Sequence, residues 1–143
     1  MRSIVLSAVA AVATAVIAAG WFVRSEAERR SRLALGERVY AEQCASCHGD
    51  NLEGQPDWQT PLPSGRLPAP PHDVSGHTWH HSDEELFAIT KGGMAAIVPD
   101  HESDMPAFGE TLSDAEITAV LDFIKSTWPD RERAYQEARK PRP

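Results

Sequence analysis

The segment Cys44-Ala45-Ser46-Cys47-His48 holds both cysteines of the 143-residue chain, three positions apart, with a histidine directly after the second. A redox dithiol, a zinc site and a disulfide are three uses of such a pair. A thioredoxin-like dithiol lies beside a βαβ pattern, which this sequence lacks. A structural zinc site takes four sulfur or imidazole ligands, so two cysteines are too few. A disulfide across so short a loop would add little stability to the domain.

Covalent attachment of haem accounts for all five positions. Two thiols at i and i+3 on a helical turn can each add to one haem vinyl group, and the next histidine then lies under the iron. The segment therefore predicts one haem c, attached through Cys44 and Cys47 and ligated by His48.

The apolar residues are unevenly distributed. Ile4–Val23 is a continuous apolar run apart from Ser7, Thr14 and Gly20, whereas only about a third of the residues from Arg24 onward are apolar. Such a share is small for a self-sufficient core. The proline-rich stretch 49–81 is also long for a loop unless it wraps something. A haem would supply both the missing apolar surface and the body that the loop surrounds.

The apolar run itself is long enough for a membrane-spanning helix. Twenty residues in a helix extend about 30 Å, the thickness of the hydrocarbon layer. We therefore predict a single transmembrane anchor in residues 1–23. A cleaved signal sequence is the alternative, with small residues suited to cleavage at 13–15 and at 18–20. The arginines in 24–32 would lie on the exported side, against the positive-inside tendency.

Charge divides the rest of the chain into three parts. Residues 24–32 form a charged juxtamembrane linker, 33–129 the folded domain, and 130–143 a charged C-terminal tail. The domain has sixteen acidic residues and four basic ones. This balance excludes nucleic acid as a partner and favours a protein with a basic docking surface, although acidity can also serve solubility alone.

Helical patterns dominate the domain, and no segment resembles a strand. Residues 25–43 show helical spacing, Ser82–Glu85 is a capping box for a short helix that ends at Gly92-Gly93, and Ser113–Glu116 is a second box. The second box begins the clearest amphipathic helix, which Pro129 ends or kinks. The tail beyond is helical or frayed. We expect an all-α fold.

The segments Gly36–Gly49 (GERVYAEQCASCHG) and Asp104–Gly109 (DMPAFG), followed by a terminal helix, resemble those of monohaem class I cytochromes c of the membrane-anchored bacterial type. The resemblance covers residues 33–129. It implies a helical domain wrapped around one covalent haem. In that family the first helix crosses the last, so Gly36 and Tyr40 are expected to meet Phe123 and Trp128.

The iron needs a second axial ligand, and a thioether there raises the redox potential by favouring ferrous iron. Met105 matches the ligand position of the family. The other candidates are Met94 and five histidines: His72, His77, His80, His81 and His101.

The loop before residue 82 holds further candidate haem contacts. In the resembled family a carbonyl of a proline-bearing loop accepts a hydrogen bond from the iron histidine, and either Pro68 or Pro70 fits that role. Trp79 is expected near the haem propionates. The nearby His77, His80 and His81 either share this environment or form a second metal site, for which copper is the candidate.

With both axial positions filled, the iron has no open site for a small-molecule substrate. We therefore expect an electron carrier rather than an enzyme, passing single electrons between membrane redox complexes. Its haem domain would lie on the periplasmic side of a bacterial cytoplasmic membrane, or would be soluble in the periplasm after signal cleavage. Two alternatives remain: a fixed haem subunit of a larger oxidase or dehydrogenase complex, and a haem enzyme or sensor in which Met105 is displaced.

Overall fold

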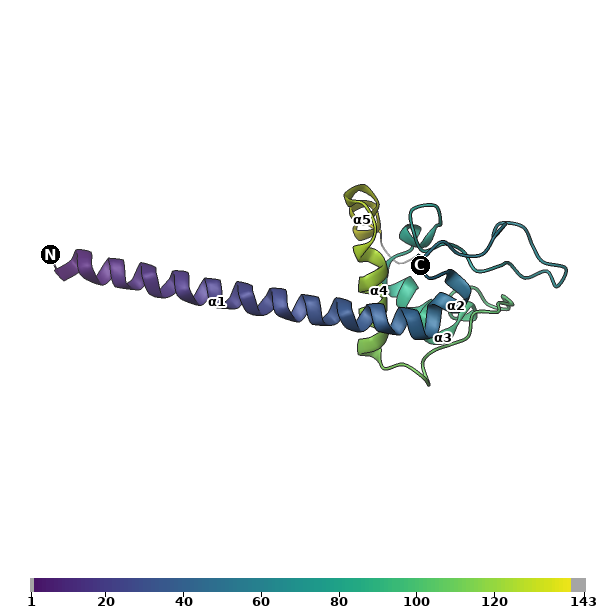
Figure 1. Ribbon diagram of the computed structural model, residues 1–143, viewed down its shortest axis with the longest axis horizontal. Helices are drawn as coiled ribbons and strands as arrows, with labels where there is room; N and C mark the ends of the chain where they lie inside the picture. The colour runs from purple at the N-terminus through teal and green to yellow at the C-terminus, as the bar shows by residue number, and fades with distance from the viewer. Residues whose placement is uncertain (1, 140–143) are drawn as a thin grey trace. The chain divides into compact units, whose positions relative to one another are not determined.

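The computed structural model describes residues 2–139, with side chains from Thr14 onward. The described part is helical and contains no strand, as predicted (Figure 1). The chain divides into two compact units, residues 1–32 and 33–143. In chain order the elements are α1 (Arg2–Val39), the π-helix η1 (Tyr40–Cys44), α2 (Ala45–His48), η2 (Thr78–His80), α3 (Asp83–Gly92), η3 (Met94–Ala96), α4 (Asp114–Ser126) and α5 (Asp130–Glu137).

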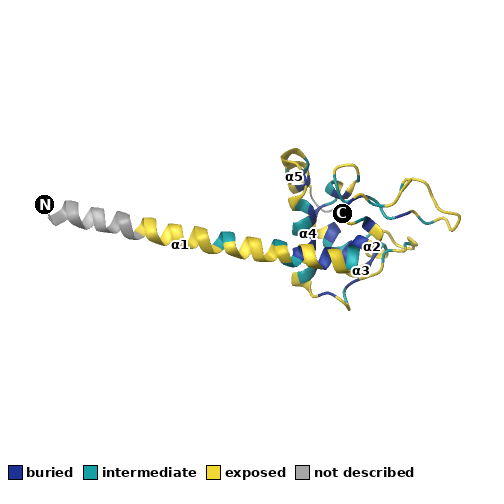
Figure 2. Cartoon of the chain, in the orientation of Figure 1, coloured by how far each residue is buried: buried dark blue, intermediate teal, exposed yellow. Residues whose placement is uncertain are grey.

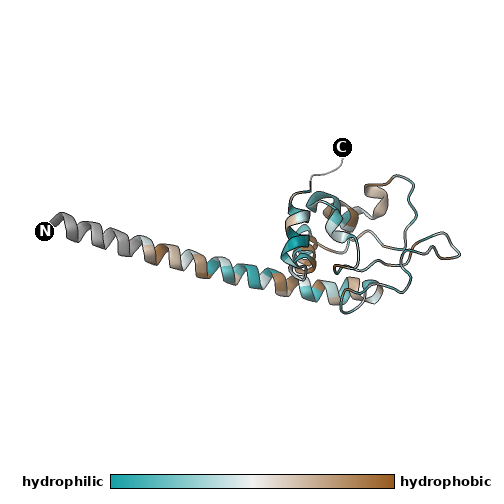
Figure 3. Ribbon diagram, turned by 90° about the horizontal axis from the view of Figure 1, so that it is seen from above, coloured by the Kyte–Doolittle hydropathy of each residue, from teal (hydrophilic) through white to brown (hydrophobic). Residues whose placement is uncertain are grey.

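The first unit is the larger part of α1. Its apolar side chains from Val16 to Val23 are exposed, and Figure 3 shows the apolar stretch giving way to the charged residues 24–32. Arg24 and Glu28 pair at 2.8 Å along this charged stretch. Much of the expected anchor lies outside the described side chains, which begin at residue 14. Within the part that the structure describes, no helix has the length and apolarity needed to cross a membrane.

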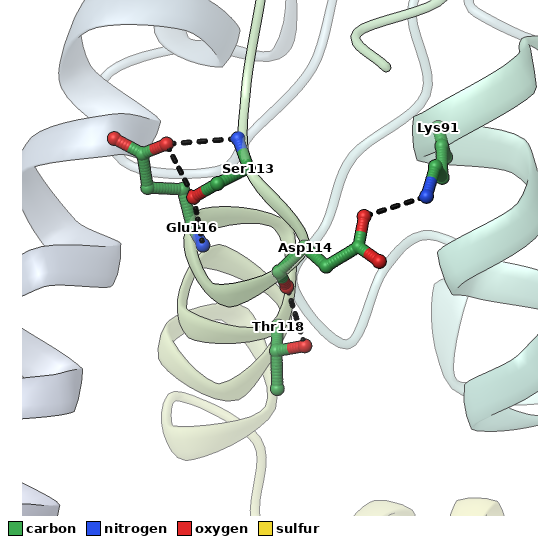
Figure 4. Close-up of polar contacts among 5 residues, drawn as sticks. All are labelled: Lys91, Ser113, Asp114, Glu116 and Thr118. Carbon is green, nitrogen blue, oxygen red and sulfur yellow. Dashed lines mark hydrogen bonds and ion pairs between the residues drawn. The ribbon is translucent and has the colours of Figure 1, made fainter.

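Both predicted capping boxes are present. Ser82 and Glu85 exchange side-chain and backbone hydrogen bonds at the start of α3, and Ser113 and Glu116 do so at the start of α4. In the second box the Ser113 N–H donates to Glu116 Oε2 at 2.9 Å, and Ser113 Oγ accepts from the Glu116 N–H at 3.3 Å (Figure 4). Lys91 then joins the two helices through an ion pair with Asp114 at 2.6 Å. These local signals fix where each helix begins.

The core of the second unit lies where the end of α1 meets α4 (Figure 2). Gly36 permits this close approach, because a Cβ atom at that position would lie 2.0 Å from the Ala119 carbonyl oxygen. One turn later the rings of Tyr40 and Phe123 are 5.6 Å apart. The expected contacts of Gly36 and Tyr40 with the last amphipathic helix are therefore present, with Phe123 as the partner of both.

Gly36→Ala is expected to lower the free energy of unfolding by about 3 kcal/mol, because the methyl group collides with backbone atoms that can move only if the helices separate. Urea denaturation of the haem-loaded protein measures this. Gly20→Ala is the matched control on the same helix, since nothing lies within 4 Å of a Cβ atom there. Equal midpoints for Gly36→Ala and the parent protein would contradict this account of the crossing.

The C-terminal tail is helical as far as α5 and packs against the loop that contains η2. Gln136 is buried, and its Nε2 donates to the His81 carbonyl at 3.2 Å and to Asp83 Oδ1 at 2.8 Å. Tyr135 meets Trp79 edge-on, with ring centroids 5.3 Å apart. The tail thus covers one side of the loop, which the charged composition of the tail alone does not predict.

Candidate functional site

The two cysteines and the following histidine lie on one short helical stretch. The backbone widens into the π-helix η1 as far as Cys44 and then tightens into the single turn of α2, which ends at Gly49 with a φ of 83°. Buried Tyr40 donates its hydroxyl to the Gly49 carbonyl at 2.9 Å and holds the end of this turn. Short π-helical segments are concentrated at functional sites.

Neither cysteine is in a disulfide. Cys44 is partly buried and packs against the hydrophobic core, whereas Cys47 is exposed. Burial, with a smaller contribution from Cys47, raises the pKa of the Cys44 thiol to about 11. Neither sulfur is used in a disulfide, and Cys44 lies against the core whereas Cys47 faces solvent.

His48 is buried, and its ring is held by the backbone of the proline-rich loop. Its Nδ1 lies 2.8 Å from the Pro70 carbonyl oxygen. A carbonyl only accepts, so Nδ1 carries the hydrogen and Nε2 keeps its lone pair. Burial lowers the pKa of His48, and the bond to Pro70 opposes this only in part. The ring is therefore neutral and oriented as a metal-binding imidazole requires.

His72 packs directly against this ring, a contact that the sequence patterns do not predict. The two imidazoles stack with centroids 3.9 Å apart. His72 Nδ1 lies 2.9 Å from Thr78 Oγ1, and its carbonyl accepts a hydrogen bond from Trp128 Nε1 at 2.7 Å. Trp128 thus reaches the site through the His72 backbone.

Met105 is one of two methionines whose side chains the structure describes, and it packs against the hydrophobic core. Its N–H donates to Ser103 Oγ at 3.1 Å. Three residues later the chain is fixed to α3, since the N–H of buried Phe108 donates to the Thr90 carbonyl at 3.0 Å. Met94, the other candidate, lies in η3 and is partly buried.

The histidines at 77 and 80 pack on different aromatic rings. His77 stacks on Trp58 with centroids 5.4 Å apart, and His80 lies 3.8 Å from Trp79. Across the described side chains, no group of three or more histidine, cysteine or acidic residues is arranged to hold a metal ion. The structure therefore gives no support to the copper alternative.

The chemistry of His48, the two cysteines and Trp79 fits a haem. Apolar side chains from separate segments pack on the core yet stay partly exposed, namely Leu35, Cys44, Trp79, Phe87, Met105, Leu121 and Phe123. The Nε1 atom of Trp79 is buried with no hydrogen-bond partner among the described residues. A propionate is the kind of acceptor that this N–H lacks. An oriented imidazole, two sulfur atoms outside any disulfide and an unpaired donor together match the requirements of that group.

Comparison with known proteins agrees with this chemistry. The family described as cytochrome c oxidase, cbb3-type, subunit III matches residues 31–124. Cytochrome c-555 of Prosthecochloris aestuarii is 29% identical over 82 residues, which are 53% of this chain and 83% of that protein. No solved structure matches the chain.

Two longer relatives are oxidase subunits. The cbb3-type cytochrome c oxidase subunit CcoP of Azospirillum brasilense is 30% identical over 90 residues, 62% of this chain and 26% of CcoP. The subunit FixP of Bradyrhizobium sp. (strain ORS 278) is 26% identical over 95 residues, 65% of this chain and 27% of FixP. The chain thus spans about a quarter of the length of these relatives. It belongs to the cbb3-type cytochrome c oxidase subunit III family, a family of c-type cytochromes, and its cofactor is one covalently attached haem c.

Proposed function

We propose that the protein is an electron carrier whose haem is attached through Cys44 and Cys47 and ligated by His48 and Met105. The hydrogen bond between His48 Nδ1 and the Pro70 carbonyl carries this proposal, because it leaves Nε2 free to bind iron. Haem supplies a one-electron couple between ferric and ferrous iron.

The surrounding side chains have separate roles in this proposal. The Pro70 carbonyl orients His48, and the unpaired N–H of Trp79 would donate to a propionate. Pro68 is buried in the same loop and supports its shape. Met105 would supply the second ligand to the iron from the loop before Phe108. Two filled positions exclude substrate from the iron, so outer-sphere electron transfer is the chemistry that remains.

The domain organisation follows from the same proposal. Residues 1–23 anchor the chain in a bacterial cytoplasmic membrane, 24–32 link the anchor to the domain, 33–129 form the haem domain on the periplasmic side, and 130–143 are the tail. The exposed apolar side chains Val16–Val23 support an apolar environment for the described end of the anchor. An anchor would raise the local concentration of the domain near membrane redox complexes. A signal cleaved after export is the alternative.

The partner in electron transfer is a redox protein with a basic docking surface. The excess of acidic residues in 33–129 attracts such a surface over long range. Raising ionic strength from about 10 mM to 150 mM shortens the Debye length from about 30 Å to 8 Å and should slow electron exchange with a cationic redox protein at least tenfold. An exchange rate that rises with salt would contradict this choice of partner.

The names of the relatives favour one alternative, a fixed haem subunit of a larger oxidase. FixP and CcoP are named as oxidase subunits, and each is far longer than this chain. Purification in mild detergent separates the two functions. A lone carrier elutes without other redox centres, whereas a fixed subunit elutes together with its oxidase.

An optical spectrum tests the ligation. The ferric protein should show the methionine–iron charge-transfer band, and the ferrous protein should not bind carbon monoxide. Absence of the band together with rapid binding of carbon monoxide would refute the carrier and favour a haem enzyme or sensor in which Met105 is displaced.

A further inference from the structure

The loop that contains Met105 is joined to a distant part of the domain by an arginine. Arg66 Nη1 lies 2.5 Å from Oδ1 of Asp104, the residue directly before Met105. Arg66 Nε lies 3.6 Å from Glu102 Oε2 and is covered from solvent. One guanidinium therefore meets two carboxylates of the methionine loop, although it is 38 residues away from Asp104 in the chain.

Arg66 also lies close in the chain to the contact that orients His48. Pro70, whose carbonyl holds the His48 ring, is four residues further along. Backbone hydrogen bonds hold the loop 52–70. The Gln55 N–H donates to the Ala69 carbonyl at 2.9 Å, and the Leu62 N–H donates to the Arg66 carbonyl at 2.8 Å. The stretch 66–70 therefore contacts His48 through the Pro70 carbonyl. It also contacts Asp104, the neighbour of Met105, through the Arg66 guanidinium.

The methionine loop has mainly local contacts before Phe108 fixes it to α3. The Val98 N–H donates to the Met94 carbonyl, the His101 N–H to the Val98 carbonyl, and the Met105 N–H to Ser103 Oγ. Most of residues 98–107 are exposed. A neutral thioether on such a loop stays on iron only as firmly as the loop itself is placed.

We propose that Arg66 is a positioning residue for Met105, and that its ion pairs with Asp104 and Glu102 hold the methionine loop against the haem. This rests on the ligation by Met105 proposed above. A guanidinium suits the role, since its planar fork addresses two carboxylates at once, whereas an ammonium is a single point charge.

Competition by imidazole for the iron of the ferric, haem-loaded protein measures how firmly the loop is closed. Arg66→Gln is expected to bind imidazole about fivefold more tightly than the parent protein, a modest change because the ion pairs are partly exposed. Asp104→Asn should have a similar effect, and the double variant should add little to either one. Arg66→Lys should recover part of the parent behaviour.

Lys125→Gln is the matched control. It removes the same charge and an ion pair of 2.7 Å, but its partner Asp83 lies at the start of α3 and not in the methionine loop. Its imidazole affinity should equal that of the parent. The thermal midpoint is followed in parallel, since a purely structural role would shift the midpoint and leave imidazole affinity unchanged.

The outcomes separate the two proposals. A parent protein without the methionine–iron band refutes ligation by Met105, and this proposal with it. A parent protein with the band, but with the same imidazole affinity in Arg66→Gln, overturns the role of Arg66 alone. Full additivity of Arg66→Gln and Asp104→Asn, or an equal gain in Lys125→Gln, overturns it as well.

Discussion

Replacement of both cysteines, Cys44→Ser with Cys47→Ser, is expected to leave the chain without covalently bound haem and the domain from residue 33 onward largely unfolded. Serine hydroxyls do not form the thioether bonds that attach haem at this motif. Without haem, the partly exposed apolar side chains at the core would lack the apolar surface that a haem supplies, while the cost in conformational entropy of ordering the long loop remains. Haem staining after denaturing electrophoresis and far-ultraviolet circular dichroism measure the two effects.

Replacement of one cysteine alone tests the same prediction, with a smaller expected effect. Cys47→Ser leaves the partly buried Cys44 in place, so one thioether remains possible, and haem content and yield should fall without disappearing. Ser46→Ala is the control, because Ser46 is an exposed residue between the two cysteines in the chain and has no thiol. Haem that survives denaturation in the double variant would contradict the attachment. A haem-free chain with the full helical signal would contradict the role of haem as part of the core.

The sequence predicts best where structure depends on neighbours in the chain. The boxes at Ser82 and Ser113 predict the starts of α3 and α4, and both helices begin there, because a cap is a contact across three residues. The glycine at 93 ends α3 for a similar local reason, with a φ of 78°. The helical stretch before the cysteines was also expected, but its π-helical end at Tyr40–Cys44 has no pattern that would reveal it.

Contacts between distant residues are much less accessible from one sequence. The resemblance leaves Pro68 and Pro70 equally suited to hold His48, and only the path of the loop in space brings the Pro70 carbonyl to 2.8 Å. The stacking of His72 on His48 and the burial of Gln136 depend on segments that meet only in the folded domain. Arg66 belongs with them, because four basic residues scattered through 33–129 give no indication of which one meets the methionine loop.

Met105→Ala is expected to keep the haem attached but to open one axial position of the iron. The cysteines and His48 are untouched, so the haem should still survive denaturing electrophoresis. Loss of the thioether removes a ligand that favours ferrous iron, so the redox potential should fall by on the order of 100 mV, a small part of the roughly 0.8 V over which axial ligands set haem potentials. The ferrous form should now bind carbon monoxide, and the ferric charge-transfer band should be absent.

Met94→Leu is the matched control for this variant, since it removes the other described methionine at similar volume. It should leave the band, the potential and the exclusion of carbon monoxide unchanged. The truncation at 105 also leaves a gap beside the core, which should cost about 2 kcal/mol, so titration with carbon monoxide is done well below the thermal midpoint of the variant. A Met105→Ala protein that retains the band would exclude Met105 as the ligand, and loss of the band in Met94→Leu would assign the role to Met94. Absence of the band in the parent protein would instead point to one of the five histidines as the second ligand.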